Sequence, residues 1–332
     1  MDNETGIWIG RVWLGGGFGL APMAGVGDYA FRRVCRAHGA AYTVTEMVSA
    51  KALCYGDRKT KQLLYLGADE HPAAAQIFGG EPAFLAEGAV IALALSGADI
   101  LDLNMGCPAG KIVKSGEGSA LMKDLRRAAA CIEAVVGAVK VPVTVKFRAG
   151  WDAEHVNAVE FARMAEEAGA AALCVHGRTR EQMYAGSADT ALMRAVVEAA
   201  GIPVMVNGDV VSGESGCRLL RETGARFALI GRGALGNPWI FEDCRAALAG
   251  GAFSPPPLAE RLRTAAEQIA LAAEQKGERT ACREARAHLT HYLRGIRSAA
   301  RYRELASRVS SVAELNALIA AVLAEAEDAE KA

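Results

Sequence analysis

Cys107 lies in a loop whose residue types are typical of a catalytic site. Residues 100–103 are mostly apolar and predict a buried strand, and this run ends at Asn104. Glycine and proline then force the backbone into a loop that carries Cys107, with Lys111 a short distance further on. An α/β barrel presents its catalytic residues in this way, at and just after the carboxyl end of a strand. From this stretch alone, a buried cysteine in a tight turn is an equally good interpretation.

Polar or glycine-rich segments also follow other short apolar runs. Lys146 and Arg148 share one face of such a run, and a buried lysine requires an anionic partner. No acidic cluster has the spacing of metal ligands, so we expect no metal but a phosphate-bearing organic cofactor. The other segments are Pro22-Met23-Ala24, Gln76, His176-Gly-Arg178, Asn207-Gly208-Asp209 and Gly231-Arg232. The last two match the phosphate site of barrels, which follows strands seven and eight.

The elements that must position these residues alternate between short apolar runs and longer helical stretches. Eight such runs with intervening helices predict an α/β fold, a (β/α)8 TIM barrel. A doubly wound sheet is the alternative, but no Gly-x-Gly-x-x-Gly turn follows the first run. The predicted strands are 18–23, 41–45, 73–78, 99–103, 141–147, 171–175, 204–206 and 227–230.

The barrel pattern ends near residue 250, and the chain changes character after it. We expect a barrel domain over 1–250, a proline-rich linker over 251–257 and a smaller all-helical domain over 258–332. Between Lys276 and Arg308, nine Lys or Arg residues stand against three Glu. On one continuous helix, six of the arginines would share about a quarter of the circumference, whereas a break at Gly295 would divide them into two shorter faces. They are Arg279, Arg283, Arg286, Arg294, Arg297 and Arg301.

This arginine stripe has two interpretations. A run of charge is most often a solvated helix face. On a chain whose net charge is −1, however, the stripe also suits a polyanionic partner, with Tyr292 and Tyr302 available for stacking.

Composition narrows the class of protein further. The 332 residues are 52% hydrophobic, yet their apolar stretches are too short to span a membrane. Asp2 and Glu4 precede any apolar run, so we expect no secretory signal. Eight cysteines without a Cys-x-x-Cys pair argue against a disulfide framework and indicate a cytoplasmic location.

Taken together, the motifs resemble those of a known family. They are Leu20-Ala-Pro-Met-Ala-Gly25 with Asp28, Asn104-Met-Gly-Cys-Pro108, His176-Gly-Arg-Thr-Arg180, Asn207-Gly-Asp209 and Ile230-Gly-Arg232. On these residues nearly the whole chain resembles the tRNA-dihydrouridine synthases, most closely their bacterial B-type. Gly27 departs from the pattern, because the family's turn usually has threonine there.

The resemblance implies an FMN-containing TIM barrel followed by a helical tRNA-binding domain. Members reduce the C5–C6 double bond of selected tRNA uridines to 5,6-dihydrouridine, with NADPH reducing the flavin. The resemblance makes Cys107 the donor of the proton to C5, while hydride reaches C6 from reduced FMN. It implies flavin contacts at Pro22, Met23, Ala24, Gln76, Lys146 and His176, and phosphate contacts at Asn207, Gly208, Asp209, Gly231 and Arg232.

The same resemblance places tRNA contacts in two regions. Asn104 and Arg178 are expected to orient the uracil base. Further substrate contacts are expected at Lys111 and Arg148 on the barrel, and at Arg283, Arg286 and Arg297 on the helical domain. We expect the protein to act as a monomer.

Two alternatives belong to other functional classes. An FMN-dependent oxidoreductase acting on a free pyrimidine, like dihydroorotate or dihydropyrimidine dehydrogenases, would not need the basic helical appendage. A non-catalytic RNA-binding barrel would not need an intact Cys107, Lys146 and phosphate loops.

Overall fold

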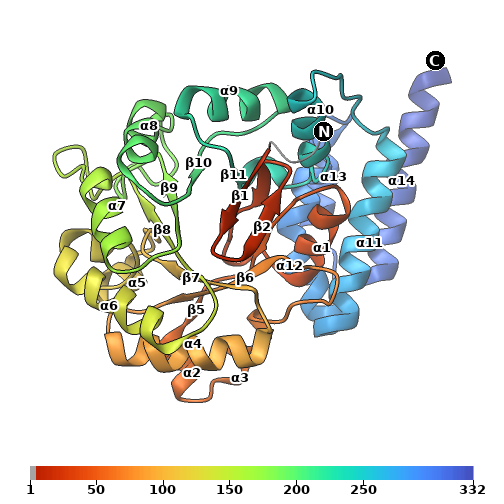
Figure 1. The fold of residues 1–332 in the computed structure, drawn as a ribbon. Coiled ribbons are helices and arrows are strands. Elements are labelled where there is room, and N and C mark those ends of the chain that lie inside the picture. Colours follow the sequence, from red (N-terminus) through yellow and green to blue (C-terminus); the bar gives the residue numbers. More distant parts are fainter. Residues whose placement is uncertain (1–4, 332) are drawn as a thin grey trace.

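The chain folds around a ring of parallel strands, which Figure 1 shows nearly end-on. The computed structural model describes residues 5–331. Within that range eight strands form the ring, at the positions where the apolar runs predicted them. In ring order they are β3 (Phe18–Leu20), β4 (Thr43–Val44), β6 (Ala73–Phe78), β7 (Ile100–Asn104), β8 (Val143–Arg148), β9 (Ala172–His176), β10 (Val204–Asn207) and β11 (Ala228–Ile230).

Backbone hydrogen bonds close the ring. Parallel pairing runs from β4 through β6 to β11 and on to β3. The remaining gap is bridged where Leu20 N donates to Tyr42 O at 2.8 Å and Ala41 N donates to Phe18 O at 2.9 Å. A doubly wound sheet would leave two open edges, so the predicted (β/α)8 barrel is confirmed.

Helices surround the ring, and capping side chains fix where several of them begin. Asp28, Asp124 and Asp189 each accept a hydrogen bond from the backbone N–H three residues further on. The surrounding helices are α1 (Tyr29–Ala37), α4 (Pro82–Ser96), α6 (Leu125–Ala138), α7 (Ala158–Glu167), α8 (Thr190–Ala199), α9 (Gly213–Thr223) and α10 (Ile240–Leu248). Shorter elements within the connections are β5 (Val48–Ser49), α2 (Ala50–Cys54), α3 (Arg58–Leu63), α5 (Gly110–Lys114), η1 (Gly118–Lys123) and η2 (Arg232–Ala234).

Side chains inside the ring lie in layers, because alternate residues of a strand share a face. On β7, Ile100 belongs to an apolar layer at the amino-terminal end of the barrel. Asp102 lies one level higher, beside Gln76 and Thr144 of the neighbouring strands. Asn104 forms part of the top level, at the carboxyl ends of the strands. The barrel therefore changes from apolar to polar toward one mouth.

A β-hairpin that the sequence reading missed covers the opposite end. It consists of β1 (Gly6–Ile9) and β2 (Val12–Gly15), which lie across the centre of the ring in Figure 1. Ile9 and Leu14 are fully buried in the apolar layer of the barrel. The hairpin therefore seals the amino-terminal end and leaves the other mouth for ligands.

The chain after the barrel forms a group of helices, which lies beside one side of the barrel, next to α1 (Figure 1). Residues 251–257 contain no helix or strand. The helices are α11 (Leu258–Lys276), α12 (Glu278–Tyr292), α13 (Ala299–Ala306) and α14 (Val312–Lys331). They enclose an apolar core of their own, which Trp239 of the barrel also joins. Lys276 Nζ strengthens the contact by donating to Asp28 Oδ2, the N-cap of α1, at 2.5 Å.

The arginine stripe does not form one continuous helix face. Helix α12 ends at Tyr292, and α13 begins only at Ala299. Between them Gly295 and Ser298 have φ of 75° and 52°, in the left-handed region that ends a helix. Over the described residues, no helix is both long enough and apolar enough to cross a membrane.

Candidate functional site

A cavity of about 1240 Å³ opens at the carboxyl ends of the barrel strands. Cys107 lines it, as does every residue for which the sequence predicted a cofactor contact. Asn104, Arg148 and Arg178 line it too. Residues distant in the sequence converge there because parallel strands that close a ring end at the same mouth.

The Cys107 loop is anchored to the strand that precedes it. Asn104 Oδ1 accepts hydrogen bonds from Cys107 N at 2.8 Å and from Gly106 N at 3.2 Å. Ser119 holds the other side, because its N–H and its hydroxyl both donate to Cys107 O. Burial raises the pKa of the Cys107 thiol, against smaller opposing effects of the Ala109 N–H and Arg148. The thiol is therefore protonated at neutral pH and can serve as an acid.

Lys146 presents a positive charge to the cavity. Its Nζ donates to Asn207 Oδ1 at 3.0 Å, and Asn207 Nδ2 donates in turn to Leu229 O. Over residues 5–331, no carboxylate lies within ion-pair distance of Lys146. An amide neutralises no charge, so the lysine favours an anionic ligand.

Arg178 is a second cationic group of the cavity wall and is 2% exposed. Its Nη2 donates to Asp209 Oδ2 at 2.8 Å, but its Nη1 is buried without a hydrogen-bond partner. Partial burial acts to raise the pKa of Asp209, yet the Ala188 N–H and Arg178 bring it below its usual value. Asp209 is thus a carboxylate that holds the Arg178 side chain in place, and Nη1 remains available to donate to a further acceptor.

Arg148 is a brace between two loops. It is buried, with its Nε donating to Gly106 O at 2.8 Å. Its Nη1 donates to Thr179 O at 2.9 Å and to Met183 O at 3.0 Å. Burial lowers the pKa of Arg148 to about 10, so it still carries its charge at neutral pH. Its contacts hold the Cys107 loop against the loop after β9.

His176 is a neutral side chain in the top layer of the barrel. Burial, followed by the positive charges of Lys146 and Arg148, lowers its pKa to about 2. A neutral imidazole can offer one donor and one acceptor to a ligand, without adding to the positive charge there.

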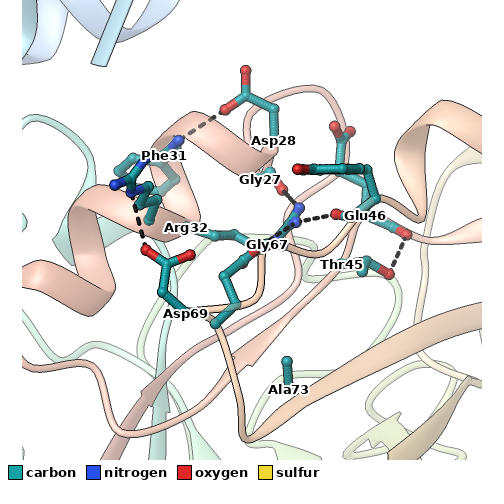
Figure 2. Close-up of polar contacts among 12 residues, drawn as sticks. Gly27, Asp28, Phe31, Arg32, Thr45, Glu46, Gly67, Asp69 and Ala73 are labelled. Carbon is teal, nitrogen blue, oxygen red and sulfur yellow. Dashed lines mark hydrogen bonds and ion pairs between the residues drawn. The ribbon is translucent and has the colours of Figure 1, made fainter. Parts of the chain in front are cut away.

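The turn after β3, residues 22–28, is held by a buried ion pair. Arg32 Nη1 donates to Gly27 O at 2.9 Å, and Figure 2 shows this contact beneath the turn. Arg32 Nε lies 2.8 Å from Glu70 Oε1, and both side chains are almost fully buried. Gly25 N also donates to Glu46, a further buried carboxylate. Pro22, Met23 and Ala24 therefore form a fixed apolar wall of the cavity.

Some of the predicted contacts lie outside the cavity. Lys111 is exposed on α5. Arg283 and Arg297 are exposed on the helical region, whereas Arg286 Nε donates to Val309 O at 3.0 Å. None of these four side chains lines the cavity.

The sequence reading missed several residues that do line it. Tyr184 stacks beneath Arg232, whose guanidinium carbon lies 4.7 Å from the ring centre. Arg261, His291 and Arg294 approach from α11 and the end of α12. Of these residues, Arg294 belongs to the predicted arginine stripe, which was the only sequence feature that pointed to it. Phe253, Pro255 and Pro256 had been assigned only to a spacer.

The residues present fit a flavin nucleotide. A group with a flat apolar face and a phosphate would meet apolar contacts at 22–24, the lysine charge and the unpartnered Arg178 nitrogen. The cavity also exceeds the roughly 300–1,000 Å³ typical of a site for one small ligand. Space therefore remains beside a cofactor for a substrate group.

Comparisons with known proteins match nearly the whole chain to one protein family. The family model described as "Dihydrouridine synthase (Dus)" matches residues 19–328. The chain is 42% identical over 291 residues to tRNA-dihydrouridine synthase B of Pseudomonas aeruginosa, covering 87% of each protein. It is 37% identical over 322 residues to a probable tRNA-dihydrouridine synthase of Treponema pallidum, covering 94% of this chain and 95% of that one.

Solved structures show similarity of fold alone. Histamine dehydrogenase from Rhizobium sp. 4-9 superposes with a TM-score of 0.58 at 13% identity, covering 80% of this chain. A 2-naphthoyl-CoA reductase gives a TM-score of 0.57 at 10% identity. The present chain spans about half the length of these proteins.

Proposed function

The chain belongs to the dihydrouridine synthase family, and from that premise we propose that it reduces uridines in tRNA to 5,6-dihydrouridine with FMN as cofactor and NADPH as reductant. The observation that carries this proposal is the cavity itself. It joins an unpaired lysine, an arginine nitrogen without a partner and a protonated thiol at one barrel mouth.

We assign the cofactor contacts to the two halves of this mouth. Pro22, Met23 and Ala24 would contact the flavin ring, with polar contacts from Gln76, Lys146 and His176. The backbone of Asn207, Gly208 and Gly231, with the Arg232 side chain, would hold the phosphate, and Asp209 would keep Arg178 in place. When bound, reduced FMN supplies the hydride for C6 of the uracil.

Cys107 supplies the proton to C5 in this proposal. Its raised pKa keeps the proton on sulfur until negative charge develops on the base. Asn104 fixes the loop through the backbone of Gly106 and Cys107, and Arg148 fixes it through Gly106 O. These contacts hold the Cys107 loop at the mouth, which supports the assignment of its thiol as the acid for a uracil beside the flavin.

The helical region, residues 258–332, is proposed to bind the tRNA. Arg261 and Arg294 bring positive charge to the lining of the cavity, and Arg283 and Arg297 are exposed elsewhere on the helical region. A uridine of folded RNA must leave its stack to enter, at a cost of a few kcal/mol. Phosphate contacts from these arginines offset that cost. An enzyme for a free pyrimidine would need none of them.

The test is reduction of an unmodified tRNA transcript by the purified protein. Loaded with FMN and given NADPH, it should form dihydrouridine at defined positions, as mapped by mass spectrometry. Cys107→Ala should retain flavin absorbance and tRNA binding but lose about a hundredfold in turnover. The matched control is Cys217→Ala, which lies on α9 away from the cavity and should keep the wild-type rate.

Each part of the proposal has its own refutation. An FMN-loaded protein that forms no dihydrouridine refutes the activity, and a protein that cannot take up FMN refutes the cofactor. Full turnover by Cys107→Ala refutes the assignment of the acid. Equal or faster turnover with NADH refutes the preference for NADPH.

A further inference from the structure

A buried carboxylate lies beneath the Cys107 loop, and the proposed reaction gives it no role. Asp102 is 3% exposed and belongs to the middle layer of the barrel. Its two oxygens accept hydrogen bonds from Thr144 Oγ1 and from Gln76 Nε2, the latter at 2.6 Å. Burial of such a group is costly, and apolar side chains would fill a barrel interior at lower cost. Its presence calls for a specific explanation.

Hydrogen bonds connect Asp102 to the loop through two amide side chains. Gln76 donates to Asp102 through Nε2 and accepts through Oε1 from Asn104 Nδ2 at 2.9 Å. Asn104 Oδ1 then accepts from the backbone N–H groups of Gly106 and Cys107. The series runs from the middle of the barrel to the residue that carries the thiol.

The donor and acceptor groups at the two ends of this series fix how the amides of Gln76 and Asn104 are oriented. A backbone N–H can only donate, so Asn104 must turn its oxygen toward the loop. An ionised carboxylate can only accept, so Gln76 must turn its NH₂ group toward Asp102. An amide rotated by 180° at either position would set donor against donor or acceptor against acceptor. Only an acceptor at position 102 makes both amide orientations agree with the loop.

We propose that Asp102 is a positioning residue that fixes the amide orientations of Gln76 and Asn104 and thereby holds Cys107 at the substrate. The expected effect on proton transfer rests on the proposed function, whereas the expected effect on the position of the Cys107 loop does not. Without the acceptor, Gln76 Nε2 loses its partner and Gln76 can turn, so Asn104 Nδ2 loses its fixed acceptor and Asn104 holds the two N–H groups less firmly. The loop then moves, and the thiol no longer meets C5 at a constant distance.

The test compares three variants that separate acceptor loss from general damage. Asp102→Ala removes the acceptor. Asp102→Asn can keep it, with Oδ1 toward Gln76 and NH₂ toward the Thr144 hydroxyl. Thr144→Val leaves the carboxylate in place. Asp102→Ser, too short to reach Gln76, replaces Asp102→Ala if that variant fails to fold.

Two measurements at pH 8 report on the thiol. In single-turnover reduction of tRNA uridine, Asp102→Ala should be about tenfold or more slower, with a larger solvent deuterium isotope effect because proton transfer limits the rate. Alkylation of Cys107 by iodoacetamide, resolved by mass spectrometry, should be about threefold or more faster than in the wild type because the loop is released. Cys217 serves as the reference thiol in the same sample, and Asp102→Asn and Thr144→Val should stay within about threefold of the wild type.

The outcomes distinguish a failure of this inference from a failure of the proposed function. A wild-type isotope effect and alkylation rate in Asp102→Ala overturns the positioning role. Equal defects in Asp102→Ala and Thr144→Val also overturn it, because they would indicate general packing damage. If the wild type forms no dihydrouridine, the proposed function fails, while alkylation still tests whether Asp102 holds the loop.

Discussion

The buried ion pair of Arg32 and Glu70 offers a direct test of how the turn after β3, residues 22–28, is held in place. We call this segment the cofactor turn, because we assign flavin contacts to it. The two side chains are 1% and 0% exposed, and two hydrogen bonds of 2.8 and 3.1 Å join them in a fork. Arg32 also donates to Gly27 O and to Tyr65 O. Glu70 accepts in addition from Gly67 N. Each guanidinium nitrogen and each carboxylate oxygen of the pair thus has at least one hydrogen-bond partner inside the protein.

Glu70→Gln leaves the guanidinium buried without its counter-charge. Removal of one partner from a buried ion pair destabilises a protein by about 3–5 kcal/mol. Arg32→Met with Glu70→Leu removes both charges, whose burial is itself costly. It leaves three backbone groups without a partner, Gly27 O, Tyr65 O and Gly67 N–H, at about 1 kcal/mol each. We therefore expect the single variant to be less stable than the double variant.

The assay is urea denaturation followed by tryptophan fluorescence, with FMN affinity measured alongside it. Glu70→Gln should also weaken FMN binding, because Arg32 fixes the turn at Gly27. Asp69→Asn is the matched control, since Asp69 pairs with Arg33 on the surface, with exposed fractions of 55% and 48%. It should change stability by no more than about 1 kcal/mol. A loss below about 1 kcal/mol in Glu70→Gln, or one equal to that of the double variant, would refute the reasoning.

Two further predictions concern charge. Arg283→Ala combined with Arg297→Ala should weaken tRNA binding and reduce the slope of log affinity against log salt by about two, and an unchanged slope would identify these arginines as a solvated face. Burial raises the pKa of Asp102 to about 6, so the folded state binds this proton more tightly than the unfolded state. Stability should therefore fall by about 3 kcal/mol between about pH 4 and pH 7.5 relative to Asp102→Asn, and a difference independent of pH in urea denaturation would contradict this.

The strand ends of the barrel could be predicted because two simple patterns coincide there. Strands such as β7 are buried on both sides, so they form short apolar runs that a sequence reveals. The chain must then turn at the mouth, and glycine, proline and polar residues mark that point. Lys146 and Asn207 were placed in one site on this ground alone, and their side chains are 3.0 Å apart.

The contribution of the helical region could not be predicted in the same way. Arg261 Nη2 donates to Tyr292 O and Arg294 O, more than 30 residues away. Whether such side chains reach the cavity depends on how helices pack against the barrel, and no local pattern records that packing. The division of the stripe at Gly295, by contrast, is predicted by the glycine itself, and the structure confirms it.

The role of Arg148 shows a different limit. Its position on β8 was predicted, and alternation placed it on the same face as Lys146. Yet three backbone carbonyls occupy its guanidinium, and these acceptors become available only when the loops after β7 and β9 have folded around it. A sequence shows that a charge is buried, but it does not show which acceptors form hydrogen bonds with it.

The cofactor turn, residues 22–28, is held by both the barrel and the helical region. Arg32 binds it at Gly27 from α1, and Lys276 binds it at Asp28 from the end of α11. His288 of α12 lies beside the backbone of Val26 and packs against Phe31 of α1. An RNA that displaced α11 or α12 would therefore pull on the same turn that we assign to the flavin. Since these contacts are to one short segment, we expect the loss of any one of them to weaken both the FMN binding and the tRNA binding that we propose.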